Sequence, residues 1–324
     1  MVTGAEQWHP HGVVTVIGDA VIDHIYRTDT MPSEGSEASG TFEAQVGGKG
    51  LNRAVAAARL GLRVRLVTVI GDDDSGRRII EYLRRENVDT GLVKVVPGTT
   101  PVAVVMVDRN GAGAFIGRVD GAKLGIADLR GEQVRAAIVS SDAVLLTFEL
   151  PTEVINEALS MIRATPQRPR LVVHPAPPVE NFQDLERHFE PIDYLNGSSW
   201  ELGELAGDSD SVGGEHFATT IAPALLARGA YCVCEVEGLA CRVRSGTRQL
   251  DIPARPEAVS ETSPAASAAF DAALAYRLVR TGQPANRADF EWATAAMAAT
   301  RTTSPLADGM PTMHEIDRIV APAR

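Results

Sequence analysis

The chain has 324 residues and a formal net charge of -11, which arises from 42 acidic and 31 basic side chains. Because no cluster of Lys and Arg stands out along the chain, we expect neither nucleic acid nor an anionic membrane as a partner. The N-terminal segment lacks a basic start followed by an apolar core, and no apolar run approaches about 18 residues. We therefore expect a cytoplasmic protein.

The N-terminal third combines a buried segment with half-exposed ones. Residues 13–17 are all β-branched, which predicts a buried central strand that ends at Gly18-Asp19. Segments 21–45 and 101–119 carry more polar residues, and Asn110-Gly111 in the second is a pair that suits a type I′ hairpin. We expect these two insertions to form a small β lid.

A glycine turn that opens a helix follows the first insertion. Gly47, Gly48 and Gly50 let the backbone approach a ligand, and the next helix directs its free N–H groups and positive dipole end toward it. The pattern predicts a site for an anion or a polyol. It differs from the phosphate loop G-x-x-x-x-G-K-[ST], since no Ser or Thr follows Lys49 to hold magnesium. A tight strand-to-helix connection without a ligand is the alternative.

Predicted helices and strands alternate from residue 131 onward. Helices at 132–139, 153–163 and 216–228 precede strands at 143–148, 171–174 and 231–236, and two Ala-rich helices follow at 264–280 and 288–300. Such alternation indicates right-handed βαβ crossovers and a mainly parallel sheet covered on both faces. We expect a doubly wound α/β fold in one domain, residues 1–324, with the β lid as an appendage.

Ligands of open parallel sheets bind beyond the carboxyl ends of the strands. The polar residues predicted to lie there are Asp19, Asp23, 47–52, 72–74, Glu149, His174 and 198–201. Each has a structural alternative, because aspartates after a strand often form turns or helix N-caps. We interpret His174 as a strand-end residue and predict no metal site, since no second His or Cys lies at ligand spacing. Cys232, Cys234 and Cys241 are expected to be buried, small apolar residues.

Taken together, several segments resemble the ribokinase-like (PfkB) sugar kinases. They are Gly18-Asp19 with Asp23, the run from Gly47 to Ala56, and Gly71-Asp72-Asp73 with Glu149. The resemblance covers nearly the whole chain, and the glycine-lysine-glycine run is one of two family signatures. It implies transfer of a phosphoryl group from ATP, with Mg, to a sugar hydroxyl. In many relatives the lid also forms a homodimer contact.

The sugar half of the site matches the family pattern. By this resemblance, six residues line a pocket for a ribose-like sugar or a nucleoside: Asp23, Gly47, Gly48, Lys49, Asn52 and Glu149. Such a set suits a polyol, because a ligand without hydroxyls would leave several fixed donors and acceptors unpaired.

The second family signature is altered. Relatives enter the C-terminal helix through glycine-alanine-glycine-aspartate, whose N–H groups hold the phosphoryl group and whose aspartate takes the hydroxyl proton. Counting back from Phe270, the anion-binding positions are Ala265, Ala266 and Ser267, and the base position is Ala268. Alanine accepts no proton, and a positioned base contributes about 10²–10⁴ in rate. Ser263 as N-cap and Pro264 at the first helical position still favour anion binding.

The nucleotide and magnesium region also departs from the family. An asparagine three residues before a glutamate corresponds to Ser198 and Glu201, so only the glutamate remains. A glycine near the phosphates corresponds to Glu235, whose carboxylate we expect to repel the nucleotide. ATP and Mg are thus implied by the resemblance and opposed by these changes.

These features lead to one expected function and two alternatives. We expect a sugar kinase homologue that binds a ribose-like sugar or a nucleoside and whose phosphotransferase activity is weak or lost. The first alternative is an active ATP-dependent kinase that uses Asp271 or Glu261 as the base. The second is non-kinase chemistry on a sugar or sugar phosphate.

Overall fold

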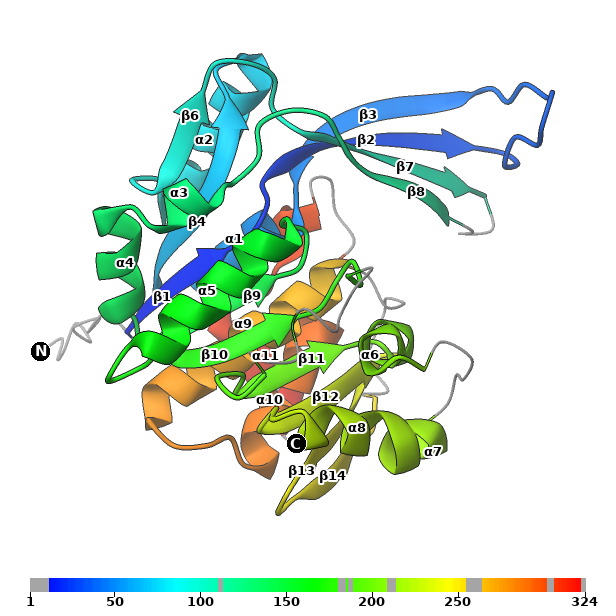
Figure 1. Cartoon of the computed structure of the whole chain (residues 1–324). Helices are drawn as coiled ribbons and strands as arrows, with labels where there is room; N and C mark the ends of the chain where they lie inside the picture. The colour runs from blue at the N-terminus through cyan, green and yellow to red at the C-terminus, as the bar shows by residue number, and fades with distance from the viewer. Residues whose placement is uncertain are drawn as a thin grey trace, which may run out of the picture.

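The structure is a computed structural model, and it describes residues 12–109, 113–179, 185, 189–208, 214–254, 264–301 and 306–321. Within these residues, ten strands form a central sheet between two layers of helices (Figure 1). The strand order is β14-β13-β12-β11-β10-β9-β1-β4-β5, and β6 also pairs with β4. The strands are β1 Val13–Ile17, β4 Arg63–Gly71, β5 Val88–Asp89, β6 Val93–Val96, β9 Ala143–Thr147, β10 Arg170–His174, β11 Tyr194–Gly197, β12 Cys232–Glu237, β13 Ala240–Ser245 and β14 Gln249–Ile252.

Within the described residues, the central sheet is parallel from β5 to β12, and β13 runs in the opposite direction, so that it pairs antiparallel with both β12 and β14. Strands β1 and β9 are buried along their whole length, as expected for parallel strands that are covered on both faces. The predicted doubly wound α/β fold is therefore confirmed. Since β1, β9, β10 and β11 run in the same direction, their carboxyl ends meet at one edge of the sheet.

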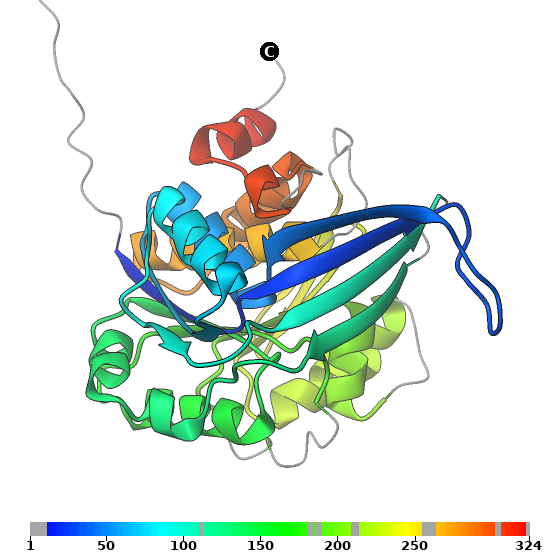
Figure 2. The same cartoon turned by 90° about the horizontal axis from the view of Figure 1, so that it is seen from above.

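Helices cover both faces of the sheet (Figures 1 and 2). One apolar core packs α1 Lys49–Arg59, α2 Asp74–Arg85, α9 Pro264–Thr281, α10 Arg287–Ala299, η3 Leu306–Gly309 and α11 Met313–Val320 against the sheet. A second core packs α3 Ile126–Leu129, α4 Glu132–Val139, α5 Thr152–Ala164, α6 Ser199–Ala206, η2 Phe217–Ile221 and α8 Ala222–Ala227 on the other face, with α7 Gly214–His216 leading into η2.

The lid is a separate four-stranded sheet in the order β3-β2-β7-β8. Its strands are β2 Val21–Thr28, β3 Gly40–Gly47, β7 Val102–Asp108 and β8 Gly113–Val119. Figure 2 shows that the sheet projects away from the body of the molecule. The predicted β lid is therefore present, with β2, β7 and β8 inside the segments 21–45 and 101–119 and β3 extending two residues beyond the first. The predicted turn at Asn110-Gly111 lies outside the described residues.

Most predicted helices and strands agree with the structure to within one or two residues. The exception is the helix predicted at 216–228, which the structure divides into α7, the π-helical segment η2 and α8. The predicted cap Ser263 lies outside the described residues. All three cysteines are buried in β12 and β13, as predicted. Among the helices of the described residues, none has the length and apolar character required to cross a membrane.

Candidate functional site

The glycine turn joins β3 to α1 at the carboxyl edge of the sheet. Gly48 has a φ of 103°, and a Cβ at this position would lie 2.5 Å from the carbonyl oxygen of Asp19. A Cβ at Gly47 would collide with the carboxylate of Asp23. Backbone therefore excludes a side chain at Gly48, whereas a side chain at Gly47 requires the Asp23 carboxylate to move. We call Asp23, Gly47, Gly48, Lys49, Asn52 and Glu149 the α1 cluster.

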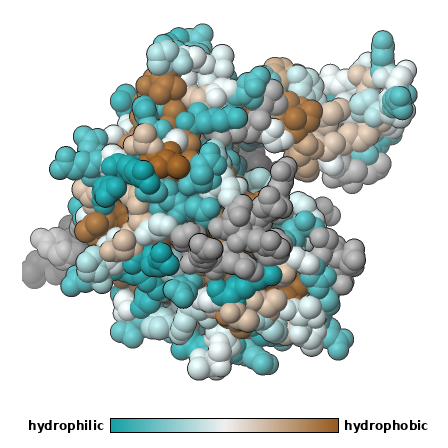
Figure 3. Space-filling model, viewed as in Figure 1, coloured by the Kyte–Doolittle hydropathy of each residue, from teal (hydrophilic) through white to brown (hydrophobic). Residues whose placement is uncertain are grey.

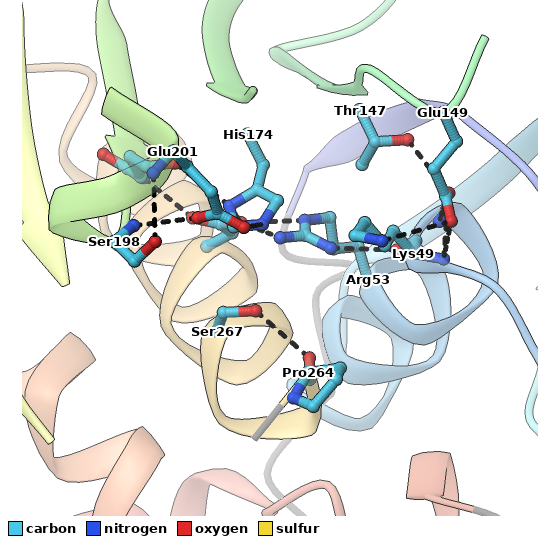
Figure 4. A network of polar contacts seen from close by, with 12 residues as sticks. Lys49, Arg53, Thr147, Glu149, His174, Ser198, Glu201, Pro264 and Ser267 are labelled. Carbon is cyan, nitrogen blue, oxygen red and sulfur yellow. Dashed lines mark hydrogen bonds and ion pairs between the residues drawn. The ribbon is translucent and has the colours of Figure 1, made fainter. Parts of the chain in front are cut away.

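The carboxylate of Glu149 lies at the N-terminus of α1. Its Oε2 accepts hydrogen bonds from the backbone N–H groups of Lys49 at 2.9 Å and Gly50 at 3.3 Å. The Lys49 ammonium lies 3.7 Å from Oε1 (Figure 4). A carboxylate at a helix N-terminus is stabilised by the helix dipole and by these N–H groups. Glu149, which follows β9, thus lies beside the glycine turn.

Asp23 is the second carboxylate of the α1 cluster. Burial and the nearby charge of Glu149 raise its pKa to about 7, against the opposing effect of Lys49. Two carboxylates in one pocket rarely ionise together, so the more desolvated one holds its proton longer. Asp23 therefore changes its charge near neutral pH and can donate or accept a hydrogen bond to a ligand hydroxyl.

Asn52 completes the α1 cluster from the first turn of α1. Its side chain is 3 % exposed, and its Oδ1 has no hydrogen-bond partner within the described part of the chain. A buried amide oxygen without a partner is costly, which points to a donor supplied by a ligand or by water.

A cavity of about 200 Å³ lies between the N-termini of α1 and α9. We call it the α9 cavity. Figure 4 shows side chains from both helices and from the strand ends around it. Its lining residues are Lys49, His174, Asn196, Gly197, Ser198, Glu201, Val236, Pro264, Ser267 and Asp271.

The first turn of α9 carries the residues expected at the anion-binding and base positions. Ala265 and Ala266 are each 1 % exposed, and Ala268 is fully buried. The hydroxyl of Ser267 donates to the carbonyl of Pro264 at 3.1 Å. Position 268 therefore supplies a methyl group and no proton acceptor, as the sequence predicted. Glu261, one of the two suggested replacements for the base, lies outside the described residues.

Asp271, the other suggested replacement, is held by a buried ion pair. Its Oδ2 accepts from Nε of Arg53 at 2.7 Å, and its Oδ1 accepts from Nδ2 of Asn196 at 2.8 Å. Burial raises the pKa of Asp271, while Arg53 and Asn196 oppose that increase. Although Asp271 lines the cavity, both of its oxygens already have partners. This geometry disfavours Asp271 as the base.

Ser198 and Glu201 form the N-terminal cap of α6. Glu201 Oε2 accepts from the Ser198 N–H at 2.8 Å, and Ser198 Oγ accepts from the Glu201 N–H at 3.3 Å. This reciprocal arrangement is a capping box. Glu201 Oε1 remains directed toward His174, at 3.7 Å from its Nε2. Both residues line the cavity, so they serve the helix and the site together.

Glu235 is paired, which corrects the expectation that its carboxylate repels a nucleotide. The residue is fully buried near the end of β12, where it lies opposite Arg242 of β13 and forms an ion pair with it. Its Oε1 also accepts from the hydroxyl of Ser199 at 2.5 Å. The neighbouring guanidinium offsets the negative charge, and Glu235 is not a lining residue of the α9 cavity.

The acidic turn at 72–74 has a structural role, and none of its residues lines the α9 cavity. Asp73 caps α2 by accepting from the Gly76 N–H at 2.8 Å, and its carboxylate also binds Thr100. The structural alternative therefore holds for Asp73, which is a helix cap.

Sequence reasoning missed Arg53, Asn196 and Arg242 and gave His174 only a structural role. Arg53 directly follows Asn52, but its partner lies 218 positions away. Asn196 ends a short buried strand, which was a usable signal. His174 Nδ1 lies 3.0 Å from the carbonyl oxygen of Asn196, so both residues belong to the wall of the cavity.

A mainly parallel α/β sheet with a β lid beside a polar cavity defines the class of ribokinase-like folds. The family of pfkB carbohydrate kinases matches residues 13–313, and the chain belongs to this family. The resemblance noted from the sequence is thereby confirmed.

Individual relatives support the same assignment. A ribokinase from Bacillus subtilis is 27% identical over 309 residues, which cover 95% of this chain and 99% of that protein. A ribokinase from Schizosaccharomyces pombe is 25% identical and covers 94% of this chain and 96% of its own length.

Solved structures share the fold. Arabidopsis thaliana ribokinase, complexed with ribose and ATP, has a TM-score of 0.78 at 22% identity, covering 96% of this chain and 99% of that chain. The nucleoside kinase of Methanocaldococcus jannaschii has a TM-score of 0.75 at 14% identity, covering 95% and 98%.

Proposed function

We propose that this protein binds a ribose-like sugar or a nucleoside at the α1 cluster and that its phosphotransferase activity is weak or lost. The observation that carries the proposal is the contrast between two helix starts. At α1, Asp23 and Glu149 lie beside the glycine turn and present carboxylates for hydroxyl groups. At α9, the position of the base is the buried methyl group of Ala268.

The residues of the α9 cavity are compatible with the phosphate end of ATP. The positive dipole end of α9 and the Lys49 ammonium both favour an anion there. Magnesium is usually bound by one or two carboxylates together with phosphate oxygens. Glu201 lines the cavity and would be the carboxylate ligand of the ion. When bound, Mg-ATP would supply the phosphoryl group. Ala265 and Ser267 stand where the family has glycine, so their Cβ atoms narrow the anion site and favour weak activity.

Calorimetric titration of the purified protein with ribose, adenosine and Mg-ATP tests this function. We expect ribose or adenosine to bind and Glu149→Gln to abolish that binding, because the amide cannot hold the Lys49 and Gly50 N–H groups as a carboxylate does. Glu153→Gln, on the exposed first turn of α5, is the matched control and should bind normally. Binding of neither ligand by the wild type would refute the proposal.

Product formation is measured on the same samples. Turnover at the 1–100 per second that is typical of kinases would contradict weak activity. Ala268→Asp should raise the rate if the missing base alone limits the reaction, provided that thermal unfolding shows that this buried position accepts the larger side chain.

One observation favours the second candidate, non-kinase chemistry on a sugar or sugar phosphate. Asp23 has a pKa of about 7 and lies close enough to Glu149 for the two carboxylates to repel each other, an arrangement suited to general acid and base roles. Incubation of ribose and ribose phosphates without ATP, followed by NMR, tests it. A new product that Asp23→Asn abolishes would establish this function.

We further propose that two copies associate through the lid. The lid sheet exposes three large apolar side chains, which are Tyr26 (40%), Phe42 (55%) and Ile116 (57%). Tyr26 pairs directly with Phe42, and the register of the strands puts the Ile116 side chain on the same face of the sheet. Figure 3 shows apolar surface over this sheet. Apolar side chains gathered on a projecting sheet favour a protein partner, and a second copy places like faces together.

A further inference from the structure

His174 is the side chain at the centre of the α9 cavity for which the proposed function has no role. It ends β10 and is 5% exposed. Its Nδ1 lies 3.0 Å from the Asn196 carbonyl oxygen, and its Nε2 lies 3.7 Å from Oε1 of Glu201 (Figure 4). Because a carbonyl oxygen only accepts, the ring proton of the neutral imidazole is on Nδ1. Nε2 therefore presents a lone pair.

Charged groups from three helices face this ring. They are Lys49 and Arg53 of α1, Glu201 of α6 and Asp271 of α9. Burial, together with Arg53 and Lys49, holds the pKa of His174 well below 6.5. The imidazole is therefore neutral at pH 7, and its Nε2 can accept a proton.

Proton acceptors gather on this wall of the cavity. Nε2 of His174 and Oε1 of Glu201 face each other as two acceptors, so a ligand must supply a separate O–H or N–H donor to each of them to satisfy both. Oδ1 of the buried Asn196 also has no hydrogen-bond partner within the described residues. A ligand that fits must present O–H or N–H groups to this wall. Lys49 belongs to both the α1 cluster and the lining of the cavity, so the two adjoin, and we infer that a sugar held at the α1 cluster directs one hydroxyl toward this wall.

On the basis of the proposed function, we propose that Nε2 of His174 accepts the proton of the sugar hydroxyl that is phosphorylated. In this step the hydroxyl oxygen forms a bond to the γ-phosphorus of Mg-ATP. The bond from that phosphorus to the bridging oxygen breaks, and ADP keeps the electron pair. The hydroxyl proton passes to Nε2, and the Glu201 carboxylate stabilises the imidazolium. His174 thus replaces the carboxylate that position 268 lacks.

His174→Asn is the test variant, because its amide can still donate to the Asn196 carbonyl. His216→Asn is the matched control, since His216 contacts Asp208 and lies outside the cavity. With ribose and Mg-ATP, we expect slow product formation by the wild type and a decrease of about 10²-fold in kcat for His174→Asn, with little change in sugar Kd. The wild-type rate should fall in acid as the imidazole is protonated, and His174→Asn should lose that dependence.

A second measurement needs no variant that could misfold. Long-range ¹H–¹⁵N NMR spectra should show a shift of the Nε2 resonance of His174 when ribose is added without nucleotide. Equal turnover by the wild type and His174→Asn, sugar binding without any product, or an unchanged Nε2 resonance in the sugar complex would overturn the proposal for His174 alone. Failure of the wild type to bind any sugar would instead overturn the proposed function.

Discussion

Arg53 and Asp271 form an ion pair inside the protein, and it joins α1 to α9. Nε and Nη2 of Arg53 each lie 2.7 Å from Oδ2 of Asp271, and the two side chains are 1% and 2% exposed. Nη1 of Arg53 also donates to the Lys49 carbonyl at 3.1 Å. The pair therefore connects the α1 cluster directly to the wall of the α9 cavity.

Removing one partner of this pair should be strongly destabilising. We expect Asp271→Ala to lower the free energy of unfolding by about 3–5 kcal/mol, because it leaves the Arg53 guanidinium buried without a counter-charge. The double variant Arg53→Met, Asp271→Leu should recover most of that loss, since apolar side chains of similar volume can replace a buried pair. Urea denaturation measures both.

The exposed pair of Arg287 and Glu291 provides the control. Glu291→Ala should change stability by no more than about 0.5 kcal/mol, because solvent screens this pair. If Asp271→Ala were as stable as the wild type, the ion pair would not hold α1 to α9. If the stable double variant lost product formation and kept its sugar affinity, the pair would act in catalysis as well as in stability.

The sequence predicted local features better than pairings between distant residues. The apolar run from residue 143 predicted a strand with Glu149 just beyond its end, at the edge of the sheet. The spacing of the glycines predicted the turn before α1. Both predictions depend only on residues that are neighbours in the sequence. Arg53 and Asp271 meet only through helix packing, which no local pattern encodes. Glu235 and Arg242 are different. A tight hairpin pairs them across seven positions, so the alternation of β12 and β13 contained the signal that the carboxylate is neutralised.

The raised pKa of Asp23 predicts a pH dependence of stability. The folded state holds this proton up to about pH 7, whereas an unfolded Asp loses it near 3.8. The folded state therefore binds more protons between these values, and Asp23 makes stability fall as pH rises through that range. Asp23→Asn should remove this contribution and raise the melting temperature at pH 8 more than at pH 5. Calorimetric melts across pH 4–8 measure the difference.

Asp23→Asn should also weaken sugar binding, because one of the two accepting carboxylate oxygens becomes an NH₂ group, which only donates. Ribose affinity of the wild type should increase as pH rises through about 7 if the ionised carboxylate accepts sugar hydroxyls. A variant that is no more stable than the wild type at pH 8 would show that Asp23 is not desolvated in the folded protein.

Two glycines of the turn should respond differently to substitution. A Cβ at Gly47 meets the movable carboxylate of Asp23, whereas a Cβ at Gly50 would lie 2.5 Å from the backbone of Gly18. Gly47→Ala should therefore fold with a stability change of about 1 kcal/mol and lose sugar affinity. Gly50→Ala should be destabilised by several kcal/mol, since backbone cannot yield as easily.

Gly246→Ala is the control, because nothing lies near the new Cβ. Urea denaturation and ribose titration of the three variants distinguish the effects. Unchanged sugar affinity in Gly47→Ala would mean that Asp23 does not contact the ligand.

The exposed face of the lid predicts self-association. Phe42 is 55% exposed, and its ring lies 5.1 Å from that of Tyr26, so one charged substitution disrupts a pair of aromatic anchors. We expect the wild type to sediment as a dimer and Phe42→Glu to shift it toward the monomer.

Val139→Glu is the matched control, because Val139 is 59% exposed on α4, away from the lid. A specific dimer buries about 1,200–2,000 Å² in total, which exceeds what two side chains supply, so His24 and Met106 on the same face should also become protected from solvent. A wild type that sediments as a monomer at every concentration would refute the lid contact.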